Sequence, residues 1–548
     1  MKDPTCNLIV LIVVIPLMMG LLCVPLVNRT RLCRVIGSLS FSATFLLACT
    51  LLVVRGDQGV LVSQMGGWAA PYGITLVFDA LSGLMLAAAS LVALGTYLYS
   101  FGSLPHRTER RYFHPLVNLM MMGVNLSFLT GDLFNLFVAF EIMLMASYGL
   151  LVIGGGRAQL RQAYKYVAMN LLASSVFVIA AGMAYGMFGT LNIADLSRLA
   201  AHQAETQTLP TGFTALGVLF LFVFALKAGV FPLWFWLPDT YPTCPIAIAG
   251  LFGGVLTKVG LYAIARTFPL IFIQDGAGHT LVVILAIAAA LTMFMGALGA
   301  LAYTGLRRVL SLMLLIGVGY ALFGIVVMSG GALEGAAFYM TQSMLVMAGL
   351  FLCCGLIERT TGTDETRRMG GLLGRPGMVW LGVMFFVGLL GVVGLPPTSG
   401  FYGKLVILRE GLAGPFWLVG LVGLGVGALT LLAALRVWST TFWGPPPEEQ
   451  DSPQESDPAT PPSRGRVSEY AGTALLVGAS LAMGFAAEPV IGTAATAGKQ
   501  LASPQVYLDA VLANPRYAAP EKTSPAPGPG SAAGSGGDPH HPHEAGHD

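Results

Sequence analysis

The stretch from Val218 to Pro245 constrains the fold of this chain more than any other. It begins as an apolar run long enough to cross a bilayer, yet Lys227 lies near the middle of that run, and Pro232 and Pro238 follow it. A charge at membrane depth costs about 2.5–3.5 kcal/mol on insertion scales, and proline removes a backbone hydrogen-bond donor. Broken backbone at that depth is tolerated only where it is buried in protein or lines a watery cavity. The pattern therefore predicts an ion path beside a broken helix.

Composition indicates that the chain is a polytopic membrane protein. Of its 548 residues, 55% are hydrophobic and 10% are charged, whereas a soluble domain carries about 25% charged residues. The net charge of +2 gives no indication of a nucleic-acid partner. The sequence has no GxGxxG, P-loop or HExxH motif, so no nucleotide, flavin or zinc cofactor is predicted. We expect a membrane protein that is not an enzyme.

At roughly 20 apolar residues per span, the sequence predicts an all-α polytopic protein with about fourteen transmembrane helices. The predicted spans are 7–27, 34–54, 75–101, 114–131, 133–153, 160–188, 212–232, 243–266, 279–301, 307–328, 333–357, 377–408, 415–440 and 468–492. An even number of spans puts both termini on one side. The loops on the opposite side hold 18 Lys and Arg residues against 8 on the side of the termini. The positive-inside rule then places both termini outside the cytoplasm.

The chain divides into four predicted regions. Residues 1–110 hold the first three helices, and residues 111–415 form the core that carries the buried charges. Residues 416–495 hold the last two helices, joined by a loop at 444–466 that is rich in Pro, Glu, Asp and Ser and is expected to be disordered. Residues 496–548 are expected to form a disordered, low-complexity tail, which ends in four histidines.

A second broken span follows in the other half of the chain. It contains Pro396 and Pro397, with Lys404 a few residues later. In the first broken span the lysine precedes the prolines, and in this one it follows them. Paired discontinuous helices are typical of transporters built from inverted repeats, so a weak internal repeat is predicted.

Four charged side chains are predicted within the membrane. They are Glu141, Lys227, Lys258 and Lys404. Leaving all four unpaired would cost on the order of 10–14 kcal/mol on the insertion scale, so we expect pairing or hydration, with Glu141 and Lys227 as the natural pair. An apolar environment favours the neutral amine of a lysine, and a nearby carboxylate favours the charged form. Motion of Glu141 would thus control the proton on Lys227, and the lysines would form a proton relay.

These residues resemble a known family. Phe-Leu-Thr-Gly-Asp-Leu-Phe-Asn-Leu-Phe-Val-Ala-Phe-Glu at 128–141, Lys-Ala-Gly-Val-Phe-Pro-Leu-Trp-Phe-Trp-Leu-Pro-Asp-Thr-Tyr-Pro at 227–242 and Leu-Phe-Gly-Gly-Val-Leu-Thr-Lys-Val-Gly-Leu-Tyr-Ala at 251–263 look like helices 5, 7 and 8 of the D subunit of Mrp (Mnh) multisubunit Na⁺/H⁺ antiporters. A wider resemblance, over about 115–415, is to the antiporter-like subunits of respiratory complex I. Names of the type NADH-quinone oxidoreductase are common in this family, but no NAD or quinone site is recognisable in this sequence.

The resemblance implies a fold, partners and roles. The fold has fourteen helices with two inverted five-helix repeats, helices 4–8 and 9–13. The implied partners are the A, B, C, E, F and G subunits of an Mrp complex, in a bacterial inner membrane, with H⁺ and a monovalent cation as the transported ions. Glu141 and Lys227 become a coupled pair, Lys258 the centre of the relay and Lys404 its exit. Pro232, Pro238, Asp239, Pro396 and Pro397 would support the two broken helices.

The second half departs from the family pattern. Thr341, Gln342, Ser343 and Met347 stand where family members commonly have His and Lys. Amide and hydroxyl groups orient water but do not titrate near neutral pH, so either water completes the relay or the route is interrupted. These departures keep open the alternative of a structural subunit that does not conduct protons. A second alternative to antiport is a proton-pumping subunit of a redox-driven complex, such as a membrane-bound hydrogenase or a relative of complex I.

Overall fold

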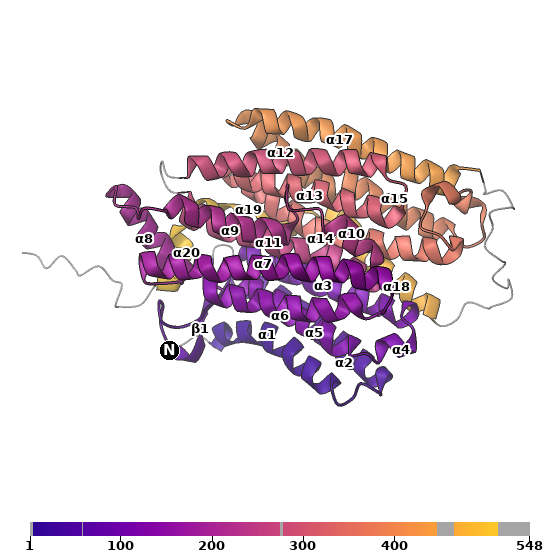
Figure 1. Cartoon of the computed structure of the whole chain (residues 1–548), viewed down its shortest axis with the longest axis horizontal. Helices are drawn as coiled ribbons and strands as arrows, with labels where there is room; N and C mark the ends of the chain where they lie inside the picture. The colour runs from indigo at the N-terminus through magenta and orange to yellow at the C-terminus, as the bar shows by residue number, and fades with distance from the viewer. Residues whose placement is uncertain (1–3, 57–58, 274–277, 446–464, 513–548) are drawn as a thin grey trace, which may run out of the picture. The chain divides into compact units, whose positions relative to one another are not determined.

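A computed structural model describes residues 4–56, 59–273, 278–445 and 465–512 of the chain, and most of them are helical (Figure 1). Nine of the described helices are long and apolar enough to cross a membrane, or ten if the bent pair α18–α19 is one span. Four shorter apolar helices, α1, α5, α9 and α15, accompany them. The predicted class, an all-α polytopic membrane protein, is confirmed. The number of fourteen spans and the inverted relation between two repeats stay predictions.

The helices are α1 (Pro4–Cys23), α2 (Thr30–Val54), α3 (Ala80–Ser103), α4 (His106–Glu109), α5 (Phe113–Leu129), α6 (Leu133–Val152), α7 (Arg157–Phe188), α8 (Ile193–Glu205), α9 (Phe213–Ala228), α10 (Leu237–Thr240), α11 (Ile246–Thr267), α12 (His279–Ala302), α13 (Leu306–Val327), α14 (Gly330–Thr361), α15 (Val379–Val393), α16 (Ser399–Ala413), α17 (Trp417–Trp438), α18 (Gly465–Phe485), α19 (Glu488–Ala502) and α20 (Gln505–Leu512). Two short strands, β1 (Leu61–Gln64) and β2 (Thr75–Phe78), pair antiparallel.

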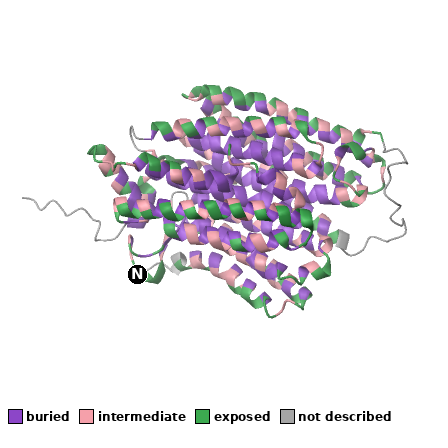
Figure 2. Cartoon of the chain, in the orientation of Figure 1, coloured by how far each residue is buried: buried purple, intermediate pink, exposed green. Residues whose placement is uncertain are grey.

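Three helices form the centre of the bundle. Every residue in the most apolar window of α11, α13 and α14 is buried, whereas only a third of the corresponding windows of α2 and α17 are buried. Figure 2 shows this as a buried interior flanked by helices that are exposed along one side. A close contact of glycine with backbone lets α9 approach α11: a Cβ added at Gly260 of α11 would lie 2.5 Å from the backbone nitrogen of Ala228 in α9. The central helices therefore place Lys258 deep within the protein.

Both predicted helix breaks are present, and they share one local geometry. The first half-helix, α9, ends at Gly229 with φ +75°, and α15 ends at Gly394 with φ +83°. In each break the N–H of the following residue bonds to a carbonyl five residues back, from Val230 to Ala225 at 2.9 Å and from Leu395 to Leu390 at 3.2 Å. This is the Schellman arrangement, which favours glycine because of its positive φ. The prolines after each glycine then prevent the first helix from continuing.

The structure corrects three predicted boundaries. The span predicted at 75–101 begins as strand β2, and helix α3 starts at Ala80 because Asp79 caps it through a capping box with Ser82. The span predicted at 468–492 ends at Phe485, where the chain bends by 80° into α19. The disordered tail predicted from residue 496 begins too early, since α19 and α20 continue to Leu512 and α19 buries apolar side chains. Residues 446–464 of the loop predicted at 444–466, and the tail from 513, lie outside the described residues.

Candidate functional site

Lys227 lies in the last turn of α9, where the helix breaks. Its side chain is 5% exposed, and its ammonium donates a hydrogen bond to Asn170 Oδ1 of α7 at 3.1 Å. The ring of Phe140 in α6 lies 5.7 Å from Nζ. The C-terminal end of a helix carries a partial negative charge that stabilises a cation. The break therefore provides an electrostatic site for a buried ammonium.

Glu141 does not form the direct ion pair with Lys227 that the sequence predicts. The half-buried carboxylate of Glu141, on α6, instead accepts a hydrogen bond from the hydroxyl of Ser174 on α7. Glu141 is still near enough to act electrostatically on Lys227. Helix α7 packs against both α6 and α9. Two of its polar side chains, Ser174 and Asn170, therefore bind the carboxylate and the ammonium separately. Asn170 and Ser174 carried no signal that sequence reasoning used.

Lys258 is the most deeply buried of the three lysines. It lies near the middle of α11, is 1% exposed, and donates to the backbone carbonyl of Gly253 at 3.1 Å. Gly253 is five residues nearer the start of the helix, so the ammonium lies back toward that end. No acidic side chain forms an ion pair with Lys258 among the residues that the structure describes. A fully buried lysine without a counter-ion is costly and marks a functional position in a membrane protein.

Lys404 lies on α16, the second half of the other broken helix, but its ammonium reaches back to the first half. It donates to the carbonyls of Val392 at 2.8 Å and Val393 at 3.0 Å, which are the last residues of α15. The ring of Tyr320 lies 4.4 Å from Nζ, and a cavity of about 300 Å³ adjoins the lysine between α16 and α17. The order of lysine and proline differs between the two spans, yet both ammonium groups lie at the C-terminal end of the half-helix that precedes the break.

The long helix α14 separates Lys258 from Lys404. It packs against both α11 and α16, and it buries the four side chains that depart from the family pattern, Thr341, Gln342, Ser343 and Met347. The Oε1 atom of Gln342 is buried and has no hydrogen-bond partner in the described part of the chain. A buried unsatisfied amide oxygen is a place where an ordered water binds. Three of these four side chains are polar, and none of the four titrates near neutral pH.

Asp239 joins the segment after the first break to two other helices. Its carboxylate accepts from Lys165 of α7 at 2.8 Å and from Arg308 of α13 at 3.2 Å. The neighbouring Arg307 donates to the carbonyls of Pro242 and Cys244, each at 2.9 Å, and pairs with Glu358 of α14. These contacts tie the segment after the break to α7, α13 and α14. The supporting role of Asp239 stays a prediction.

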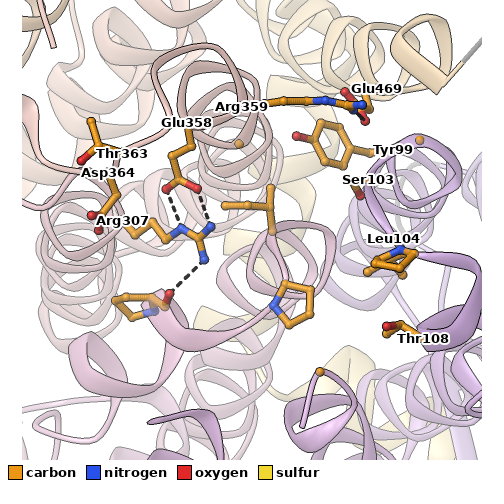
Figure 3. Close-up of a pocket in the computed structure, with 18 residues that line it drawn as sticks. Tyr99, Ser103, Leu104, Thr108, Arg307, Glu358, Arg359, Thr363, Asp364 and Glu469 are labelled. Carbon is orange, nitrogen blue, oxygen red and sulfur yellow. Dashed lines mark hydrogen bonds and ion pairs between the residues drawn. The ribbon is translucent and has the colours of Figure 1, made fainter. Parts of the chain in front are cut away.

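An open pocket of about 940 Å³ lies beside this segment (Figure 3). The C-terminal ends of α3 and α14 and the N-terminal ends of α11 and α18 line it, and Tyr99, Glu358 and Glu469 are among its side chains. Arg307 pairs with Glu358 and Arg359 pairs with Glu469 at its wall. Figure 3 shows the two ion pairs on different sides of the opening.

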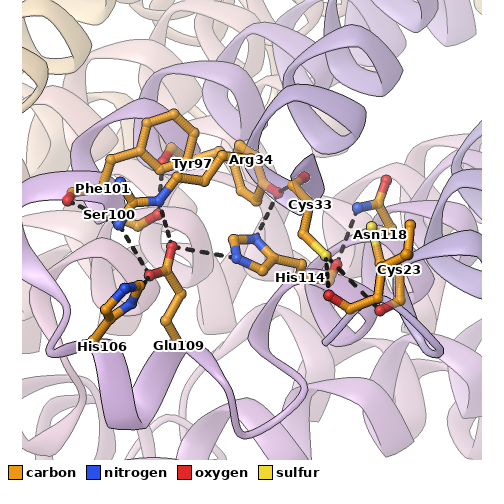
Figure 4. A network of polar contacts seen from close by, with 11 residues as sticks. Cys23, Cys33, Arg34, Tyr97, Ser100, Phe101, His106, Glu109, His114 and Asn118 are labelled. Carbon is orange, nitrogen blue, oxygen red and sulfur yellow. Dashed lines mark hydrogen bonds and ion pairs between the residues drawn. The ribbon is translucent and has the colours of Figure 1, made fainter. Parts of the chain in front are cut away.

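Sequence reasoning missed a buried network around Glu109, at the join between α3 and α5 (Figure 4). Its carboxylate lies 2.6 Å from Arg34 Nε, 3.2 Å from His114 Nε2 and 3.2 Å from His106 Nδ1. Burial alone would raise the pKa of Glu109, but hydrogen bonds and positive charges from His114 and Arg34 outweigh burial and lower it to about 2. Arg34 is 75 residues before Glu109 in the sequence. The two histidines are close to Glu109 in the sequence but form no recognisable motif with it, so the sequence gives no sign of the network.

Sequence reasoning also missed an ion pair at the C-terminal end of α11. Arg266 in its last turn forms a buried ion pair with Asp79 at 2.6 Å. The hydroxyl of Tyr262 accepts from Arg266 and donates to the carbonyl of Phe128 at 2.6 Å. The ring of Tyr507 in α20 lies 5.2 Å from the guanidinium carbon of Arg266. These contacts anchor α11 to α3, α5 and the C-terminal helices.

The fold and the site are those of a multi-pass membrane protein with buried lysines at two helix breaks. Residues 130–430 match the family described as NADH:quinone oxidoreductase/Mrp antiporter, TM. The chain is 38% identical over 515 residues to the D subunit of the Na⁺/H⁺ antiporter of Alkalihalophilus pseudofirmus, covering 92% of this chain and 99% of the relative. It is 34% identical to the D subunit of a probable K⁺/H⁺ antiporter of Rhizobium meliloti, covering 94% of this chain and 99% of the relative.

A solved structure gives the same result. A chain in the structure of the Mrp complex from Dietzia superposes with a TM-score of 0.84 at 30% identity, covering 93% of this chain and all of that one. The chain therefore belongs to the NADH:quinone oxidoreductase/Mrp antiporter family. The resemblance that the motifs around Glu141, Lys227 and Lys258 indicated is confirmed.

Proposed function

We propose that the chain is the D-type subunit of a multisubunit antiporter, which exchanges a monovalent cation such as Na⁺ for protons. Relatives named as the D subunits of Na⁺/H⁺ and K⁺/H⁺ antiporters match it over nearly their whole length, and these names describe transporter components and not enzymes. Its partners are the other subunits of an Mrp-type complex, for which the likeness to the Dietzia complex is the support. The chain resides in a bacterial inner membrane, with both termini outside the cytoplasm as the distribution of Lys and Arg predicts.

The observation that carries the proposal is the placement of three buried lysines, two of them at helix breaks. Lys227 takes up a proton while Glu141 stabilises its charged form, and releases it when that stabilisation weakens. Lys258 receives the proton at the centre of the bundle, and Lys404 passes it on beside the second break. Water bound at Gln342 and the neighbouring hydroxyls of α14 bridges Lys258 and Lys404, because the side chains of residues 341–347 do not titrate near neutral pH.

One observation favours a second candidate function. Residues 341–347 of α14 carry no side chain that titrates near neutral pH, so without bound water the relay would stop at Lys258. The chain would then keep the antiporter fold and support the complex without conducting protons itself. The two candidates differ in whether exchange depends on the buried lysines.

Cation/proton exchange in everted vesicles that carry the whole complex tests the proposal. Wild type is compared with Lys227→Ala and with the control Lys499→Ala, which changes an exposed lysine of α19. We expect Lys227→Ala to abolish exchange while the complex still assembles, and Lys499→Ala to exchange like wild type. Full exchange by Lys227→Ala would reject the relay and leave the structural role.

A further inference from the structure

The two α7 side chains that contact the charged pair lie one helical turn apart. Asn170 accepts from Lys227 at 3.1 Å, and Ser174 donates to Glu141. Residues four apart lie on the same face of a helix, with a rise of about 6 Å between them. Helix α7 therefore holds the ammonium and the carboxylate apart by one turn, although both point toward it.

The amide of Asn170 is oriented for this contact. Its Nδ2 donates to the backbone carbonyl of Tyr166 at 2.9 Å, one turn earlier in α7, so its Oδ1 must face Lys227. The Asn170 side chain is 2% exposed. A buried amide whose donor end is fixed to its own helix offers a single acceptor, and the structure gives that acceptor to the lysine.

We propose that Asn170 is a positioning residue that competes with Glu141 for the ammonium of Lys227. With the ammonium on Asn170, as in this structure, the ion pair is open and Ser174 holds the carboxylate. With the ammonium moved by one turn to Glu141, the ion pair is closed. This inference rests on the proposed relay and supplies the switch that the relay needs.

The surroundings of Lys227 allow these two positions. From α6, the carboxylate of Glu141 acts on it electrostatically, and the ring of Phe140 lies 5.7 Å from Nζ. From α11 the nearest charged residue along the chain is Lys258, two residues before the Gly260 that packs on the last turn of α9. A carboxylate retains an ammonium in its charged form more strongly than a neutral amide does. Transfer from Glu141 to Asn170 therefore prepares Lys227 to release its proton.

Three variants of the whole complex test this inference by exchange rate and by its dependence on pH. Asn170→Asp puts a carboxylate directly on the ammonium and is expected to reduce exchange by more than about tenfold. Asn170→Ala leaves Glu141 as the only side-chain acceptor that we assign to Lys227. The pH of half-maximal exchange is then expected to rise by about one unit. The control Ser175→Ala changes an exposed hydroxyl that donates to the carbonyl of Leu171 in its own helix, and it should match wild type.

The outcomes separate this inference from the proposed function. If both Asn170 variants show the wild-type rate and pH profile, Asn170 does not compete with Glu141 for the ammonium of Lys227. The proposed relay is tested separately by Lys227→Ala. A lower rate for Asn170→Ala with an unshifted profile would also overturn the competition, because a merely structural role lowers the rate alone. If the Asn170 variants do not assemble, Ser174→Ala gives the answer. It frees Glu141 to approach Lys227, so the same alkaline shift is expected, and an unchanged profile rejects the inference.

Discussion

The buried network around Glu109 makes a quantitative prediction about stability. The pKa of its carboxyl is lowered from 4.5 to about 2, because the contributions of His114 and Arg34 exceed the opposing effect of burial. A difference of about 2.5 units, at 1.36 kcal/mol per unit, corresponds to about 3 kcal/mol of stability in the ionised state. Glu109 is fully buried, so solvent screening reduces this value little. Glu109→Gln should therefore destabilise the protein by about 3 kcal/mol at pH 7.

The sign of the pH dependence follows from the lowered pKa. The contribution of Glu109 is complete above the unfolded-state pKa of about 4.5, where the carboxyl is ionised in both states. It decreases as the pH falls from about 4.5 toward 2, because the unfolded state then binds the proton first. At pH 3 about 1.5 kcal/mol should remain.

Unfolding of the detergent-solubilised protein measures this difference. Wild type and Glu109→Gln are titrated with denaturant at pH 7 and at pH 3, and the exposed carboxylate of Glu205 provides the control variant Glu205→Gln. We expect the difference between wild type and Glu109→Gln to halve between the two pH values, with no change for the control. A difference that is the same at both pH values would refute the assignment of Glu109 as a carboxylate stabilised by its basic neighbours.

Three further predictions concern the breaks and the central helix. Asp79→Asn leaves Arg266 buried without its counter-ion and should cost about 3–5 kcal/mol in the same unfolding assay. Gly394→Ala should cost about 1 kcal/mol or more and reduce exchange, because φ is +83° and the new Cβ would lie 2.9 Å from Lys404 Cδ. Gly425→Ala, in open space on α17, should be neutral in both assays. Lys404→Met should abolish exchange without loss of assembly, and retained exchange would exclude Lys404 from the relay.

The parts of the fold that could be predicted are those that follow from the chemistry of the bilayer. Long apolar runs predict helices, and a lysine beside prolines predicts a break, because lipid offers no partner for a charge or a free carbonyl. Strand β2 and helix α19 were mispredicted for a related reason. Thr75–Phe78 is as apolar as a helix start, and α19 is short and rich in small residues, so hydropathy alone does not distinguish them from their surroundings.

The contacts of the candidate site residues could not be predicted from the sequence. The positions of Lys227 and Lys404 relative to proline differ in the sequence, and only the folded chain brings each to the end of a half-helix. The indirect contact of Glu141 with Lys227 depends on two short side chains of α7, which no charge or motif marks. The ion pairs of Glu109 and Asp79 join helices far apart in the sequence, so spacing gives no signal of them.

Proton flux through Lys258 tests the central claim most directly. Its only hydrogen bond in the described structure is to the carbonyl of Gly253, so Lys258→Met keeps a side chain of similar length and removes the proton site. The purified complex is reconstituted in liposomes, and proton movement driven by a cation gradient is recorded for wild type and variant. The account predicts that flux is lost while the variant complex assembles normally. Wild-type flux through Lys258→Met would contradict a relay that crosses the protein through its buried lysines.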